Sequence, residues 1–165
     1  MNRSENESPP LSDGAQPSSP GGNGEACLIL GLLVALVGWA LYLVGMRPQW
    51  FGLERAPGVG LVQLLILSVG WVIFAAGAYW SIAAMWPKGQ PWPLRADIGA
   101  RLLATGTVLV VLAALADVFG LGSHPWPLTP SFGPWQQAGV LIGQGVGFLG
   151  VLLMWPPKDI SPPRS

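Results

Sequence analysis

Residues 26–46 read ACLILGLLVALVGWALYLVGM, a stretch that contains no charged side chain. An α-helix rises about 1.5 Å per residue, so about 20 apolar residues cross the roughly 30 Å hydrocarbon core of a bilayer. Because lipid cannot hydrogen-bond backbone N–H and C=O groups, a segment that crosses it is expected to be helical. This stretch therefore predicts a membrane-spanning helix.

Three further apolar runs of comparable length follow, at about 58–86, 98–121 and 134–155. The strands of a membrane β-barrel would instead be runs of about 10 residues with alternating polarity, and the sequence has no such pattern. The sequence therefore predicts an all-α integral membrane four-helix bundle, with the four-span domain at residues 26–156.

The composition supports a membrane protein and excludes several other classes. Hydrophobic residues make up 51% of the 165-residue chain and charged residues only 10%, against about 25% charged residues in soluble domains. Eight Lys and Arg balance eight Asp and Glu, so the basic excess of a nucleic-acid binder is missing. One Cys and one His exclude a disulfide framework and a multi-Cys/His metal site. We expect a lipid bilayer as partner, no nucleic acid and no cofactor or metal.

The two ends of the chain differ from the apolar runs. Residues 1–25 are rich in Ser, Pro, Gly and Asn, and so few apolar side chains cannot offset the entropy of ordering. We predict a disordered cytoplasmic tail there, rather than a signal peptide, which would begin with basic residues followed at once by an apolar run. Residues 157–165 form a short C-terminal tail.

The distribution of basic residues predicts the orientation. Four spans place both termini and the loop at 87–97 on one side, and Arg47 and Arg55 on the other. The side of the termini carries more basic residues near the spans: Lys88, Arg95, Arg101, Lys158 and Arg164. Cytoplasmic segments are enriched in Lys and Arg, so both termini are expected in the cytoplasm. Small size and a composition rich in Ala, Gly, Pro and Trp favour a bacterial inner (plasma) membrane.

Tryptophans gather near the ends of the spans, with Trp86, Trp92 and Trp155 on the side of the termini. Amphipathic rings favour the headgroup level, which makes interfacial anchoring the leading interpretation. A tryptophan-lined ligand pocket is the alternative.

Short strings recur along the chain. Phe-Gly-Leu occurs at 51–53 and 119–121, an offset of 68, and Met-Trp-Pro occurs at 85–87 and 154–156, an offset of 69. A third echo is a Gln followed by Gly at seven-residue steps, with an offset of 73: Gln63, Gly70 and Gly77 against Gln136, Gly143 and Gly150. The pattern predicts two tandem helical hairpins, roughly 26–96 and 97–156, that run in the same direction. Chance is the alternative, because Gly, Leu, Trp and Pro are abundant here.

Small residues predict how the helices pack. Lipid tails are as apolar as leucine, so membrane helices associate through close backbone contact at small residues and through interhelical hydrogen bonds. Glycines recur at helical spacing in all four runs: Gly31, Gly38, Gly45, Gly70, Gly77, Gly106, Gly139, Gly143 and Gly147. The last three form a doubled GxxxG motif. The fourth run has glycine on more than one face, which predicts a homo-oligomer or a larger membrane complex.

Asp117 is the one acid deep inside an apolar run, and a buried acid in a membrane is costly. It is expected on the small-residue face, near the outer end of the third run. Five other polar residues are expected on the same outer side, the two glutamines at a depth similar to that of Asp117: Arg47, Arg55, Gln63, Gln136 and His124. We predict a cluster in which Asp117 pairs with one arginine and the glutamines donate their amides. The cluster is either a structural lock for four helices or a site for an ion, a proton or a small polar ligand.

Four residues outside this cluster have simpler interpretations. Asp97 and Arg101 are four positions apart, so Asp97 is expected to cap the third helix and pair with Arg101. Gln144 lies in mid-span and could hydrogen-bond across a helix pair. Cys27 lies at the inner end of the first span, where a buried or interfacial free thiol is expected and lipid modification is the alternative.

The sequence contains no recognisable catalytic motif or set of convergent reactive groups. We therefore expect no enzymatic activity. The leading function is a non-catalytic accessory, scaffolding or self-associating membrane subunit. The alternative is a small oligomeric transporter or channel with a polar site around Asp117.

Overall fold

The computed structural model describes the following residues: 22–47, 50, 52, 61–87, 89, 91–116, 118–120 and 133–157. Within them the chain forms four helices, and no strand: α1 (Gly22–Met46), α2 (Leu61–Met85), α3 (Leu94–Ala114) and α4 (Pro134–Met154). All four are long and apolar enough to cross a membrane. The predicted all-α four-helix architecture is confirmed.

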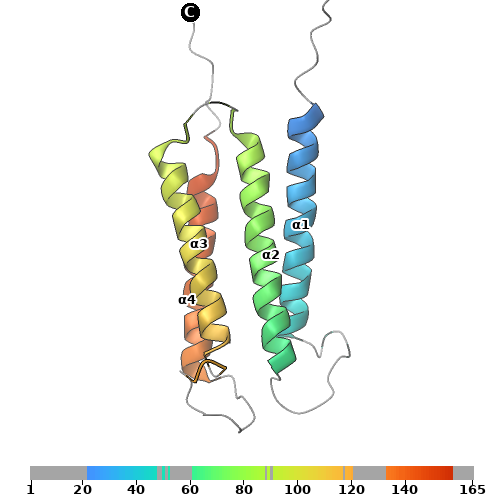
Figure 1. Ribbon diagram of the computed structural model, residues 1–165, viewed down its shortest axis with the longest axis vertical. Coiled ribbons are helices and arrows are strands. Elements are labelled where there is room, and N and C mark those ends of the chain that lie inside the picture. Colours follow the sequence, from blue (N-terminus) through green and yellow to red (C-terminus); the bar gives the residue numbers. More distant parts are fainter. Residues whose placement is uncertain are drawn as a thin grey trace, which may run out of the picture.

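The four helices pack as two hairpins, as predicted. Helix α1 contacts α2 along its length and α3 contacts α4, whereas the contacts of α2 with α3 and α4 are much less extensive (Figure 1). The N-terminal end of α1, the C-terminal end of α4 and the α2–α3 connection all lie at one end of the bundle (Figure 1). We call this the terminal end.

Close backbone contact sets the register of the first hairpin. A Cβ atom added at Gly38 would overlap the backbone of Phe74, and one added at Gly70 would overlap the backbone of Tyr42. Only a hydrogen fits at these positions, so α1 and α2 approach each other as closely as small-residue packing of membrane helices allows.

The second hairpin is built in the same way. A Cβ atom at Gly106 would lie 2.5 Å from the backbone nitrogen of Gly147, and one at Gly143 would lie 2.8 Å from that of Val110. The glycines of α4 that meet α3 are three or four positions apart and so lie on one face of the helix: Gly139, Gly143, Gly147 and Gly150.

The two hairpins pair in equivalent registers. Gly38 contacts Phe74 in the first hairpin, and Gly106 contacts Gly147 in the second. Gly106 comes 68 positions after Gly38, and Gly147 comes 73 positions after Phe74. These are the offsets of the Phe-Gly-Leu strings and of the Gln-Gly-Gly echo. The Met-Trp-Pro strings at the ends of α2 and α4 have an offset of 69 instead of 73. They therefore lie one helical turn away from equivalent positions. The Gln-Gly-Gly echo therefore marks positions that correspond in space.

All nine predicted packing glycines lie at helix contacts, since a Cβ atom at any of them would come within 3.1 Å of a neighbouring helix. In α4, Gly139 and Gly143 face α3, and Gly147 also lies against the indole of Trp71 on α2. Gly145 has open space around it and is exposed. The glycines of α4 thus pack against two neighbouring helices of the same chain, α3 and α2, and Gly145 is the exception.

The third helix is displaced from the run predicted at 98–121. It begins at Leu94, directly after Pro93, whose extended backbone (φ −63°, ψ 148°) precedes the first turn. It ends at Ala114, because Leu115 leaves the helical conformation (φ −99°, ψ 11°). A prediction from apolar residues alone starts this helix too late in the sequence, because Arg95 and Asp97 are charged yet belong to the helix.

Candidate functional site

The two hairpins meet at an aromatic cluster. Its rings come from α1, α2 and α4: Trp39, Tyr42, Trp71, Phe74 and Phe148. Trp71 is fully buried at its centre, and its ring meets that of Phe148 edge to face with centroids 5.5 Å apart. Edge-to-face rings attract each other through their quadrupoles. We call this group the aromatic seam, because it joins the first hairpin to α4.

A polar pair lies beside the aromatic seam. The side-chain amide of Gln144 donates a hydrogen bond to the hydroxyl of Tyr42, which in turn donates to the sulfur of Met46 at 3.3 Å. Gln144 is the central residue of α4 (Pro134–Met154), whereas Tyr42 lies one turn before the end of α1 at Met46. Such interhelical bonds contribute about 0.6 kcal/mol on average and up to about 1.7. The pair links the first helix to the last, and thus one hairpin to the other.

The sequence singled out Gln144 as a residue able to bond across helices, but it did not identify the partner. Tyr42 lies on the face of α1 that packs against α2. Its hydroxyl reaches α4 because Gly70 lets the backbone of α2 lie directly against that of Tyr42. The spacing of small residues within one helix gives no signal of that contact.

Two buried polar atoms of α2 lack a hydrogen-bond partner among the described residues: the Ser68 hydroxyl and the Trp71 indole nitrogen. Ser68 is 4% exposed and Trp71 0%. Three positions apart, they lie on neighbouring turns of the helix. Buried polar groups normally find a partner, because leaving one unpaired costs about 1–3 kcal/mol. A water molecule or a small polar ligand would supply it.

Half of the predicted polar cluster lies outside the described residues, namely Asp117, Arg55 and His124. The other members are Arg47, Gln63 and Gln136. In the part of the chain that the structure describes, these three form no hydrogen bond or ion pair with one another.

Each of the three has a local environment of its own. Arg47 is exposed and stacks its guanidinium over Trp50, 5.7 Å from the ring centroid, as in a cation–π contact. Gln63 is half-buried in the first turn of α2. Gln136 is only 8% exposed, and its Oε1 accepts a 2.9 Å hydrogen bond from the backbone N–H of Gly133. Gln136 is thus a capping residue of α4 whose amide nitrogen has no partner among the described residues.

The predicted pairing of Asp97 with Arg101 is confirmed, with 3.0 Å between Oδ2 and Nη2. The predicted capping role of Asp97 is wrong, because the cap position is Pro93 and no side chain bonds the free N–H groups. Asp97 instead lies in the first turn, where a negative charge favours the helix dipole. Cys27 is a free thiol, as expected, and is exposed.

Three hydroxyl groups within the spans bond to their own helices. Ser81, Thr105 and Thr107 each donate to the carbonyl four residues earlier, at 2.8, 2.9 and 2.8 Å. This is the usual way to satisfy a hydroxyl where water is absent. Among the residues described, no group of three His, Cys, Asp or Glu could hold a metal ion.

At the terminal end, two side chains bond to the C-terminal end of α4: Trp86 from the first hairpin and Arg95 from α3 of the second. The Trp86 indole donates to the carbonyl of Met154 at 3.2 Å, and Arg95 donates to the carbonyl of Trp155 at 2.6 Å. Trp86 is half-buried and therefore does more than anchor the interface. Both bonds cap the C-terminal turn of α4, where backbone carbonyls have no helical partner.

Four apolar spans, with large apolar side chains exposed around the outside of the bundle, define a multi-pass membrane protein in contact with the lipid bilayer. Comparison of the chain with protein-family models, curated proteins and solved structures gives no match.

Proposed function

We propose that this protein is a non-catalytic membrane subunit that acts as an accessory, a scaffold or a self-associating component. One observation carries the proposal: the hydrogen bond between the side chains of Gln144 and Tyr42 joins the two hairpins. The hydroxyls of Ser81 and Thr107 likewise bond their own backbones. This use of polar groups suits a protein whose task is to hold a shape and present surfaces to other spans.

Self-association is supported by Gly145. It is the glycine of α4 that the chain's own packing does not use, and it lies between the exposed side chains of Leu141 and Leu149 on successive turns. A glycine between two large residues leaves a hollow on the helix surface into which a side chain of a second copy fits.

We expect Gly145→Leu to fold normally and to lose self-association. Nothing lies within 4 Å of a Cβ atom at this position, and leucine favours a helix by about 1 kcal/mol over glycine. The measurement is the mass of the protein–detergent complex by light scattering, with Leu141→Ala as a variant that keeps the hollow open. An unchanged oligomer in Gly145→Leu, or a monomeric native protein, would contradict self-association through this face.

We further propose an inner-membrane location with both termini in the cytoplasm, on the strength of the basic residues near the terminal end. In a Cys27→Ser background, Ser123→Cys should react with an impermeant thiol reagent outside intact cells, and Gly89→Cys should not. The reverse labelling pattern would invert the orientation.

A small oligomeric transporter or channel is the second candidate. It is favoured by the unpartnered polar atoms of Ser68, Trp71 and Gln136, because an unsatisfied polar group in a membrane calls for water or a ligand. The same candidate function is supported by Asp117, because this acid lies within an apolar run of the sequence.

Asp117→Asn separates the two functions. A structural ion pair with Arg47 or Arg55 predicts lower stability, by less than about 3 kcal/mol near the interface, with partial rescue by the charge-swapped pair. A transport site predicts normal folding, lost flux in liposomes and no rescue. We expect reduced stability with rescue; wild-type stability with lost flux would replace the subunit proposal by the transporter.

A further inference from the structure

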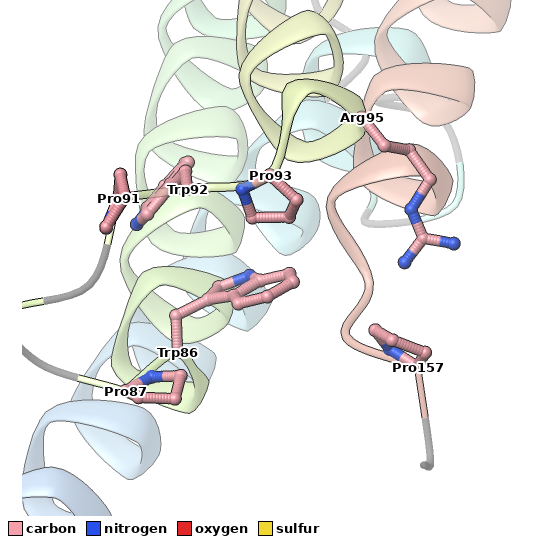
Figure 2. A pocket seen from close by; sticks show the side chains of 7 residues that line it. All are labelled: Trp86, Pro87, Pro91, Trp92, Pro93, Arg95 and Pro157. Carbon is pink, nitrogen blue, oxygen red and sulfur yellow. The ribbon is translucent and has the colours of Figure 1, made fainter. Parts of the chain in front are cut away.

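A pocket of about 350 Å³ opens at the terminal end, where the α2–α3 connection meets the end of α4. Its lining combines two tryptophans, four prolines and one cation: Trp86, Pro87, Pro91, Trp92, Pro93, Arg95 and Pro157. Figure 2 shows the indole of Trp86 and the ring of Pro93 facing the gap that Arg95 and Pro157 close from the other side. Its size is within the range of small-molecule sites, about 300–1,000 Å³.

Arg95 brings a positive charge to this pocket. Its Nη2 donates to the Trp155 carbonyl at 2.6 Å, which holds the guanidinium in place and leaves further N–H donors free. Among the described residues it forms no ion pair, since Asp97 is engaged by Arg101. A guanidinium with free donors on one edge recognises a phosphate or carboxylate through paired hydrogen bonds.

The rest of the pocket is apolar and held in position. The hydrogen bond from Trp86 to the Met154 carbonyl fixes one indole, and contact with Tyr79 at 5.7 Å between ring centroids supports that of Trp92. The proline rings carry no N–H and offer only hydrocarbon faces and carbonyls. A fixed cation beside apolar rings fits an amphiphile, a molecule with an anionic group next to hydrocarbon.

The position of the pocket identifies the amphiphile. Trp86 directly follows the last residue of α2, and Arg95 is the second residue of α3, so the pocket lies where two membrane spans end. That is the level of the lipid headgroups, where basic pockets between spans bind anionic lipids. We propose that this pocket binds the headgroup of an anionic phospholipid, with the phosphate on Arg95 and the glycerol region against Trp86 and Trp92.

The test uses the full chain in an uncharged detergent, with thermal unfolding and native mass spectrometry as readouts. Phosphatidylglycerol should raise the melting temperature and remain bound as a discrete adduct, and phosphatidylcholine should do so much less. Arg95→Gln should weaken phosphatidylglycerol binding about fivefold, the effect of about 1 kcal/mol per basic residue. Arg95→Lys keeps the charge but loses the paired hydrogen bonds, so its affinity should fall between those of the native protein and Arg95→Gln.

Arg101→Gln is the matched control, because Arg101 lies on the same helix but is neutralised by Asp97. Its affinity for phosphatidylglycerol should equal that of the native protein. Equal losses in Arg95→Gln and Arg101→Gln, or equal stabilisation by phosphatidylcholine, would overturn the proposal. Stabilisation by inorganic phosphate as large as that by phosphatidylglycerol would also overturn it, in favour of a soluble anion.

Discussion

Gly143→Leu is expected to prevent the second hairpin from closing. A Cβ atom there would lie 2.8 Å from the Val110 nitrogen and 2.9 Å from the Gly106 carbonyl oxygen, both of them backbone atoms that cannot turn aside. Overpacking a tight interface costs about 1–3 kcal/mol and occasionally more, and a whole leucine between two backbones belongs at the upper end. Unfolding by a denaturing detergent, followed by circular dichroism, should show a loss of about 3 kcal/mol or no folded protein at all.

Two substitutions on other faces of α4 serve as controls. Gly145→Leu adds the same side chain two residues away, where nothing lies within 4 Å, and Leu149→Ala removes an exposed side chain. Both should unfold at the native detergent concentration. If Gly143→Leu is as stable as these two, close backbone contact does not hold α3 to α4.

Trp71→Ala should separate the hairpins while leaving each one helical. Trp71 is fully buried, and its ring meets those of Tyr42, Phe74 and Phe148. Removing a buried tryptophan costs about 3–5 kcal/mol. No other ring of the aromatic seam is buried as completely, so the seam should lose most of its packing. We expect a large fall in stability to denaturing detergent with nearly native helix content.

Trp80→Ala is the matched control for Trp71→Ala, because Trp80 lies on the same helix with 56% of its surface exposed. It should change stability by less than about 1 kcal/mol. Similar losses in the two variants would mean that burial at the seam contributes little.

Much of the fold can be predicted from the sequence because the bilayer imposes a length and an apolar composition on every span. The spacing of Gly31, Gly38 and Gly45 also shows which face of α1 packs, since only glycine allows such close approach. The bounds of α3 could not be predicted in this way. Its first turn carries Arg95 and Asp97, which lie at the headgroup level where charge is tolerated.

The candidate site was harder to predict than the fold. The bond between Gln144 and Tyr42 depends on how two hairpins dock, and no periodicity within one helix encodes that geometry. The cluster predicted around Asp117 rested only on a shared side and a similar depth. Gln136, one of its members, caps its own helix, because a glutamine in the first turn reaches the free backbone N–H of Gly133 more readily than another helix.

Disulfide formation between helices tests the central claim, that close contact between glycine-lined helices sets the register of each hairpin. A Cβ atom at Gly139 would lie 2.8 Å from that of Ala113, so a shift of about 1 Å gives the roughly 3.8 Å of a disulfide. In a Cys27→Ser background, Ala113→Cys with Gly139→Cys should crosslink rapidly under mild oxidation in membranes. Ala113→Cys with Gly145→Cys should stay reduced. Equal crosslinking of both pairs, or of neither, would contradict the account.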